Sequence, residues 1–165
     1  MGKYDVNVDT LNTWLAGTRS FRKTLTSPTD ALAIVLPLLT DEGGPLEHER
    51  VVAVALNNRN KIIDTAVMTQ GTHDISIVDP RQIGRWVLTR EAPAAALVLA
   101  HNHPSGDPSP SHHDRRVTER VGEAMELLGI HLLDHIIVGG CGDWYSMKEN
   151  GIIPDRYRRH GALLA

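Results

Sequence analysis

The sequence predicts an α/β fold, a three-layer α/β/α sandwich in which helices cover both faces of a mixed sheet. Three observations support this prediction. The chain has 165 residues, about the size of one domain, and 41% of them are hydrophobic. Apolar runs of strand length recur along the chain. Segments with helical periodicity separate many of these runs, an alternation that is typical of a sheet packed between helices.

The first predicted helix follows Ser27-Pro28 and carries the apolar segment TDALAIVLPLL. Serine and proline are common where a helix begins, and the sequence DEGGP at 41–45 ends it. Pro37 lies inside this helix and predicts a kink or an early stop. Residues 1–25 are only weakly periodic, and one short helix is expected there around LNTWLAG.

The predicted strands are apolar and several are rich in β-branched residues. ERVVAVAL, at 49–56, has the continuous hydrophobicity of a strand that is buried on both faces. AAALVLAH, at 94–101, has the same core character. The other predicted strands span 61–71, 73–78, 131–140 and 143–147.

Two more helices are expected between the strands. Pro80 opens the segment PRQIGRWVLTREA, 80–92, which has a mixed apolar stripe. Beyond residue 114 a set of apolar residues recurs at helical spacing, and Gly129 closes that helix. The set is Val117, Val121, Ala124, Met125 and Leu128. The predicted element order is therefore α-β-β-β-α-β-α-β-β.

Composition excludes several classes of protein. The formal net charge of −3 gives no bulk electrostatic reason to bind nucleic acid, and the basic stretch RYRRH at 156–160 is interpreted as a solvated tail. Cys141 is the single cysteine, so an internal disulfide and a cysteine-only metal cage are excluded. No apolar run reaches the length of a membrane span, and the N-terminus has no signal-peptide pattern. We therefore expect a cytoplasmic protein.

The stretch HNHPSGDPSPSHHD, 101–114, carries the densest set of chemically active side chains. His101 and His103 are two residues apart at the end of a predicted strand, so their imidazoles point to the same side. Asp114 follows in the first turn of the next helix, where the helix N-terminus stabilises its negative charge. Ser109 or Ser111 is expected to cap that helix.

Two imidazoles and one carboxylate form a ligand set that suits Zn²⁺, one ion per chain. Three protein ligands leave a fourth position open for water, which is typical of a catalytic zinc site. A general base is also needed, and Glu49 at the start of a buried strand is the candidate. Spacing alone leaves two alternatives open. His112 and His113 can compete as ligands, and the whole stretch can be a polar turn without metal.

The residues also resemble a known family. His101-x-His103, then Ser111 and Asp114, with an acidic residue upstream, resembles the JAMM motif of the MPN (JAB) metalloproteases. Three longer sequence segments narrow the resemblance to the bacterial RadC family. They are HNHPSGDPSPS, LLDHIIVGG and WYSMKENGII. It covers about residues 26–153. We therefore predict an N-terminal extension at 1–25 and a RadC-like domain at 26–165.

The resemblance implies a fold and a site. The family's fold is similar to that of cytidine deaminases, although the cysteine-containing deaminase motif is absent from this chain. By resemblance, zinc is bound by His101, His103 and Asp114. Glu49 matches the catalytic acid, with Glu47 as the fallback. Ser111 matches a serine that helps to hold the water or the oxyanion, and this role is compatible with a helix cap.

The implied function is a zinc-dependent hydrolase that acts on a peptide or isopeptide bond. Relatives with the JAMM motif cleave the link between a ubiquitin-like C-terminus and a lysine, which suggests such a substrate. The alternative is a protein associated with DNA repair or recombination. Longer RadC proteins carry a region that resembles helix-hairpin-helix modules, whereas only about 25 residues precede the similar region here. A third possibility, a metal-free scaffold, is disfavoured because every motif position is filled. Neither the physiological substrate nor the oligomeric state follows from the sequence.

Overall fold

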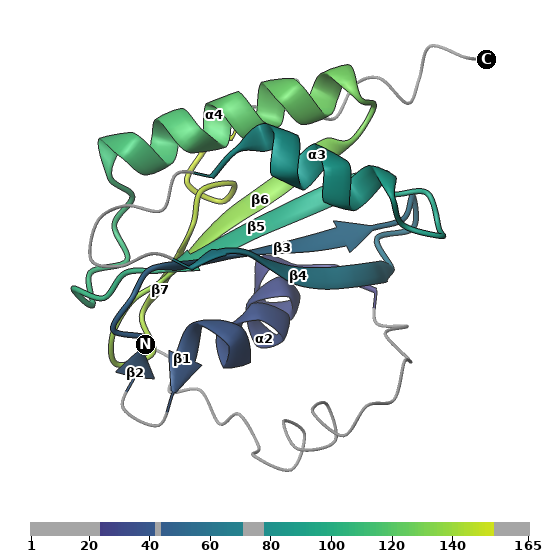
Figure 1. The fold of residues 1–165 in the computed structure, drawn as a ribbon. Helices are drawn as coiled ribbons and strands as arrows, with labels where there is room; N and C mark the ends of the chain where they lie inside the picture. Colours follow the sequence, from purple (N-terminus) through teal and green to yellow (C-terminus); the bar gives the residue numbers. More distant parts are fainter. Residues whose placement is uncertain (1–23, 42–43, 71–77, 154–165) are drawn as a thin grey trace.

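The structure is a computed structural model that describes residues 24–41, 44–70 and 78–153. The elements keep the labels of Figure 1. They are α2 (Pro28–Leu39), β1 (Thr40–Asp41), β2 (Gly44–Pro45), β3 (Arg50–Leu56), β4 (Ile62–Gln70), α3 (Pro80–Leu88), β5 (Ala96–Asn102), α4 (His112–Leu127), β6 (His131–Val138) and β7 (Trp144–Ser146). The short helix expected around 11–17, residues 73–77 of one predicted strand and the basic stretch at 156–160 lie outside the described residues.

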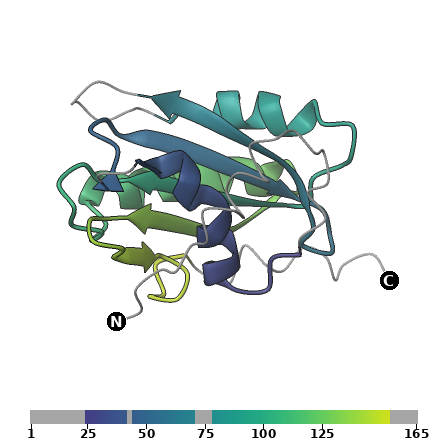
Figure 2. The same ribbon diagram turned by 90° about the horizontal axis from the view of Figure 1, so that it is seen from below.

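The predicted mixed sheet between helices is confirmed. Its five strands lie in the order β4-β3-β5-β6-β7, with β5 and β6 parallel and the other neighbours antiparallel. Helix α2 covers one face, and α3 and α4 cover the other (Figure 1). The view from below shows α2 lying across the strands (Figure 2). Two separate hydrophobic clusters result, one on each face of the sheet.

Strand β5 is the centre of the sheet, and all of its residues are buried. This explains its unbroken apolar sequence, because both of its faces contact helices. Strand β3, beside it, divides its side chains between the two clusters. Val51, Ala53 and Ala55 face α3 and α4, whereas the alternate residues Val52, Val54 and Leu56 face α2. The predicted strands at 49–56 and 94–101 are thus confirmed, with ends shifted by one or two residues.

Two details of the predicted helices are wrong. Helix α2 does not stop at Pro37 but continues to Leu39, where Thr40 caps the Leu36 carbonyl with both its N–H and its hydroxyl. Pro37 has no N–H to donate to the carbonyl of residue 33, so the last turn lacks one helical hydrogen bond, but the helix continues for two more residues. Helix α3 ends at Leu88 rather than near residue 92. The side chains of Thr89 and Arg90 bind the carbonyls of its last turn and end it there.

The start of α4 is fixed by Ser111, one of the two predicted caps. Its hydroxyl accepts a hydrogen bond from the Asp114 N–H, and the Asp114 carboxylate accepts one from the Ser111 N–H, which makes a capping box. Gly129, with φ of +72°, follows the C-terminus as predicted. The short β1–β2 pair was not expected from the sequence.

Within the part of the chain that the structure describes, no helix combines the length and the apolar character that a bilayer crossing requires.

Candidate metal centre

The three predicted ligands meet at the C-terminal end of β5. The Nε2 atoms of His101 and His103 are 3.0 Å apart. One oxygen of Asp114 lies 3.3 Å from Nε2 of His101, and the other lies 3.3 Å from Nε2 of His103. His101 and Asp114 are buried and His103 is half-buried. Among the described residues these three form the group that can hold a metal ion. His112 and His113, the possible competitors, are not part of it.

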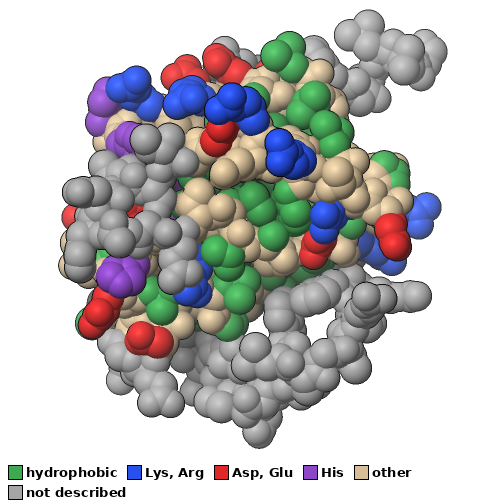
Figure 3. All heavy atoms as spheres, in the orientation of Figure 1, with side chains coloured by type: hydrophobic (Ala, Val, Ile, Leu, Met, Phe, Trp, Pro, Cys, Tyr) green, Lys and Arg blue, Asp and Glu red, His purple; other side chains and the backbone are tan. Residues whose placement is uncertain are grey.

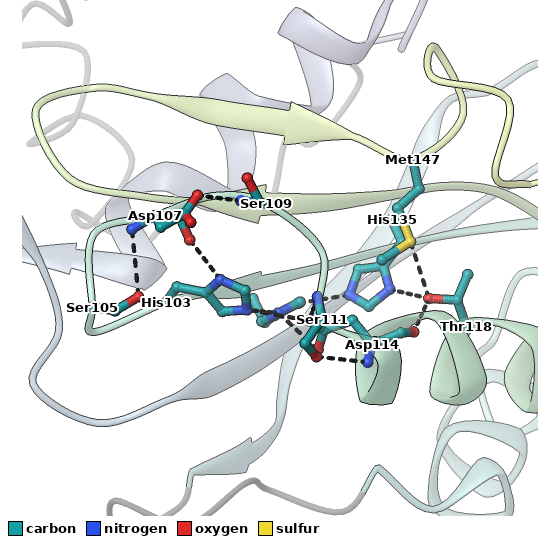
Figure 4. Close-up of polar contacts among 10 residues, drawn as sticks. His103, Ser105, Asp107, Ser109, Ser111, Asp114, Thr118, His135 and Met147 are labelled. Atoms are coloured by element: carbon teal, nitrogen blue, oxygen red, sulfur yellow. Dashed lines mark hydrogen bonds and ion pairs between the residues drawn. The ribbon is translucent and has the colours of Figure 1, made fainter.

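The proton of His103 is fixed by the loop that follows it. Its Nδ1 lies 2.7 Å from the carbonyl oxygen of Asp107 (Figure 4). A carbonyl can only accept, so Nδ1 carries the hydrogen. In the neutral ring, Nε2 is then left with a lone pair directed at His101 and Asp114.

The proton of His101 is fixed by a buried chain of hydrogen bonds. Nδ1 of His101 lies 2.8 Å from Nε2 of His135, and Nδ1 of His135 lies 2.6 Å from the Thr118 hydroxyl. That hydroxyl also lies 2.6 Å from the Asp114 carbonyl oxygen and donates to it. Both atoms of this last pair are oxygens, so the hydroxyl hydrogen must lie between them.

The direction of the chain follows from its last link. Because the Thr118 hydroxyl donates to a carbonyl, it must accept from Nδ1 of His135. Nε2 of His135 is then an acceptor, and Nδ1 of His101 is the donor. Burial lowers the pKa of His135 well below its usual value, so its ring carries a single proton. Nε2 of His101 therefore also presents a lone pair to the centre.

These assignments leave three acceptors facing one point. Two imidazole lone pairs and a carboxylate are separated by 3.0 to 3.3 Å, with no hydrogen of their own between them. Such a group repels itself unless a cation or an added proton neutralises it. Neutral imidazole and carboxylate are metal ligands, and hydrogen bonds to the far nitrogen of each ring are the usual support for such ligands. The residues present therefore fit a metal ion.

Asp114 is held in its ionised form. Burial opposes ionisation, but Nε2 of His101 and Nε2 of His103, which donate to the carboxylate when the rings are protonated, and the hydrogen bond from Ser111 outweigh it and keep the pKa of the Asp114 carboxyl far below its usual range. The Ser111 N–H contributes a short contact of 2.7 Å at the helix N-terminus. The Ser111 side chain is exposed, and its oxygen accepts the Asp114 N–H at 3.1 Å. The hydroxyl hydrogen remains available for a group outside the protein.

Glu49 is half-buried and lies one residue before β3. Val51 pairs with His101 across the antiparallel ladder, so the same register continued places Glu49 opposite His103. Burial raises the pKa of the Glu49 carboxyl, while the nearby His101 opposes this rise and Asp114 adds to it. Glu47, the fallback, has an exposed side chain.

The loop that carries His103 is clamped by the β6–β7 turn. The His103 N–H donates to the Val138 carbonyl, and the Gly140 N–H donates to the Gly106 carbonyl at 2.7 Å. A Cβ atom added to Gly139 would lie 2.4 Å from the Gly106 oxygen and 2.8 Å from Pro108. Glycine is therefore required at 139 by the close approach of two backbones.

Sequence reasoning missed two residues of this centre. His135 lies on the apolar strand β6, and its link to His101 was not foreseen. Thr118 gave no signal beyond its place on a helix. The only hint was the spacing of four residues between Asp114 and Thr118, which allows a side-chain bond to the preceding turn.

A family model described as "RadC-like JAB domain" matches residues 25–152 of the chain. Several proteins named UPF0758 are similar to it. One from Rubrobacter xylanophilus is 42% identical over 132 residues, which are 80% of this chain and 55% of that protein.

A second relative, from Caldanaerobacter subterraneus, is 43% identical over 77% of this chain and 52% of its own length. A third, from Methanosarcina acetivorans, is 36% identical over 80% of this chain and 55% of its own length. The chain thus spans about half the length of these relatives.

Proposed function

The chain belongs to the family of RadC-like JAB domains, and on that premise we propose that it is a zinc-dependent hydrolase of peptide or isopeptide bonds. The observation that carries the proposal is the set of three converging acceptors, His101, His103 and Asp114. Two imidazoles and one carboxylate are a ligand set of catalytic zinc sites. When bound, zinc would supply a Lewis acid that polarises the scissile carbonyl.

Glu49 is the proposed general base. Its carboxylate would take a proton from the attacking water and deliver that proton to the leaving amine. The pKa of Glu49 is raised by burial, which brings a carboxyl closer to the range in which a base works at neutral pH. Glu47 is less suited to this role because its side chain is exposed to water.

Ser111 is the proposed donor to the oxyanion that develops when the carbonyl is attacked. Its oxygen is engaged by the Asp114 N–H, so the position of the hydroxyl is set while its hydrogen can still be donated. Helix capping and oxyanion stabilisation are therefore compatible functions of one side chain. Ser111 is exposed, as contact with a substrate requires.

The charge distribution favours a protein substrate over nucleic acid. Figure 3 shows basic side chains above the sheet with acidic side chains beside them. The exposed face of α4 carries Arg115, Arg116 and Arg120 together with Glu119 and Glu123. A nucleic-acid groove would need an excess of positive charge. One carboxylate with two imidazoles is also a poor match for phosphodiester chemistry, which favours several carboxylates with Mg²⁺.

The first test is the metal content of the purified protein, measured by elemental analysis for the wild type, His103→Ala and His112→Ala. We expect about one zinc per chain in the wild type, a loss in His103→Ala, and full retention in His112→Ala. His112 is the matched control because it is an exposed histidine at the start of the same helix and outside the cluster. A wild type that binds no zinc after reconstitution would contradict the proposal.

Activity is the second stage of the test. Peptide and isopeptide substrates would be compared for the wild type and Glu49→Gln. The variant should keep its zinc and lose on the order of 10² to 10⁴ in rate. Zinc retention with an unchanged rate would remove Glu49 from the mechanism.

A further inference from the structure

Asn102 lies between the two histidines of the centre, and its side chain is fully buried. Its Oδ1 accepts a hydrogen bond of 2.9 Å from the Arg50 N–H. Its Nδ2 donates two hydrogen bonds of 3.0 Å, one to the Leu46 carbonyl and one to the His48 carbonyl. One side chain thus joins the end of β5 to the segment that carries Glu49.

The orientation of this amide is unambiguous. If the oxygen and nitrogen of Asn102 were exchanged, the NH₂ group would face the Arg50 N–H and the oxygen would face two carbonyls. All three contacts would then be repulsive. Among side chains of this size, only asparagine offers one acceptor and two donors in this arrangement.

The three bonds determine the backbone on both sides of Glu49. The His48 carbonyl belongs to the peptide group before the Cα of Glu49, and the Arg50 N–H belongs to the peptide group after it. When both peptide planes are fixed, the direction of the Glu49 Cα–Cβ bond is fixed as well. Glu49 itself lies outside β3, where the strand ladder no longer holds the chain.

We propose that Asn102 is a positioning residue that directs the Glu49 carboxylate toward the metal centre. The proposal rests on the proposed function, because it assumes that Glu49 acts beside a bound metal. Without these hydrogen bonds the Glu49 carboxylate would move with the segment that precedes β3. A misplacement of about 1 Å can cost a hundredfold in rate. Asn102 removes that freedom and binds neither the metal nor the substrate.

The first experiment is amide hydrogen exchange on the metal-free protein, comparing the wild type with Asn102→Ala. Loss of Oδ1 should speed exchange of the Arg50 amide by at least about tenfold, while amides further along β3 stay protected by the sheet. The control is Ser146→Ala, which also removes a buried hydrogen-bonding group but acts on Asp134. It should leave Arg50 unchanged. An Arg50 amide that stays fully protected in Asn102→Ala would overturn the proposal.

The second experiment asks whether Asn102 acts through Glu49. Cobalt replaces zinc as the spectroscopic probe, and the pH midpoint of its visible absorption is measured for the wild type, Asn102→Ala, Glu49→Gln and the double variant. Asn102→Ala should bind cobalt within a few-fold of wild type and shift the midpoint in the direction that Glu49→Gln does. The double variant should match Glu49→Gln, because two groups that act as one unit are not additive. Fully additive shifts would overturn the proposal.

Two further outcomes remain distinguishable. A wild type that binds neither zinc nor cobalt contradicts the proposed function, while exchange at Arg50 still decides whether Asn102 fixes the backbone around Glu49. If Asn102→Ala does not fold, Asn102→Leu takes its place in the cobalt cycle. It keeps the size of the side chain and adds no charge but removes the acceptor and both donors, so the same non-additivity with Glu49→Gln is expected.

Discussion

His101 and His103 face the same point, but they are held there by different means. His101 is 1% exposed and is held through the side chains of His135 and Thr118. His103 is half-buried and is held by a backbone carbonyl, that of Asp107, within a loop packed against the β6–β7 turn. Both supports place the proton on Nδ1 and leave Nε2 free. The same tautomer is thus selected by side-chain hydrogen bonds for His101, in the core, and by a backbone carbonyl for His103, nearer the surface.

This difference determines which substitutions should damage each ring. The support of His101 is sensitive to the loss of a single polar atom, since the Thr118 hydroxyl is the group to which His135 donates. The support of His103 is sensitive to added volume, because it depends on close contact between two backbones. Substitutions that change one of these properties at a time therefore separate the two supports.

Gly139→Ala should have the largest effect. Its Cβ would lie 2.4 Å from the Gly106 oxygen, so the loop must move away from the turn. We expect a loss of about 1 to 3 kcal/mol in the free energy of unfolding. Zinc affinity should fall by up to about 100-fold, as when a supporting group of a metal ligand is lost. Urea unfolding and competition with a chromophoric chelator measure the two quantities.

The matched control is Gly129→Ala. Gly129 also needs its glycine, because its φ is +72°, but a Cβ atom there would meet open space. A loss of about 1 to 2 kcal/mol with unchanged zinc affinity is expected. Equal loss of zinc affinity in the two variants would show that general destabilisation, not the loop of His103, is responsible.

Thr118→Val should have the next effect, through His101. Valine keeps the shape of threonine, so packing is maintained while the acceptor for His135 is removed. The cost in the free energy of unfolding should be about 1 to 3 kcal/mol. Zinc affinity should fall about tenfold, because the tautomer of His101 is no longer selected. Nitrogen chemical shifts of the imidazoles would report the tautomer directly. A His101 that stays protonated on Nδ1 in this variant would refute the role assigned to the chain.

The smallest effect concerns pH. In the metal-free protein, burial opposes protonation of His103, but the hydrogen bond to Asp114 outweighs it and raises the pKa of His103. A raised pKa in the folded state contributes stability below the unfolded value, about 6.5, and that stability is lost as pH rises through the folded pKa. Stability should therefore fall between about pH 6 and pH 8 in a chelating buffer.

The check on this slope is urea unfolding of His103→Gln, in which the contribution of His103 is absent. Added zinc should reverse the trend in the wild type, because metal ligands must be deprotonated. A wild-type slope that persists unchanged in His103→Gln would have to come from another group, such as Glu49, whose pKa is also raised.

The fold was predictable where burial leaves a strong pattern. The strands around 49–56 and 94–101 are apolar on both faces, so their sequences alone indicate the centre of a sheet. Helix ends were less predictable. The end of α3 depends on Thr89 and Arg90, which bind its last carbonyls, and no periodicity shows that. The start of α4 at Ser111 rather than Ser109 follows from the capping box with Asp114, a signal that was present in the sequence.

The convergence of the three predicted ligands was predictable because it is local. His101 and His103 share a strand end, and Asp114 begins the next helix. Residues that support the centre depend on register between strands. His135 pairs with Leu99, on the face that His101 shares, and Asn102 meets the segment before β3 because Val51 pairs with His101. A single sequence contains no measure of these offsets, so His135, Thr118 and Asn102 could not be assigned from it.

The parallel pairing of β5 with β6 affects how the newly made chain folds and binds metal. The chain must pass through α4 between these strands, and Asp114 and Thr118 lie on that crossover. The ligands are neighbours in sequence, but the hydrogen bond from His101 to His135 forms only after this long-range contact, so the newly made chain does not yet hold the centre in place. A cation that needs all three ligands binds the folded protein and not the unfolded chain, so its binding free energy stabilises the native state almost in full. The supply of metal during synthesis would then help to set how much protein escapes degradation.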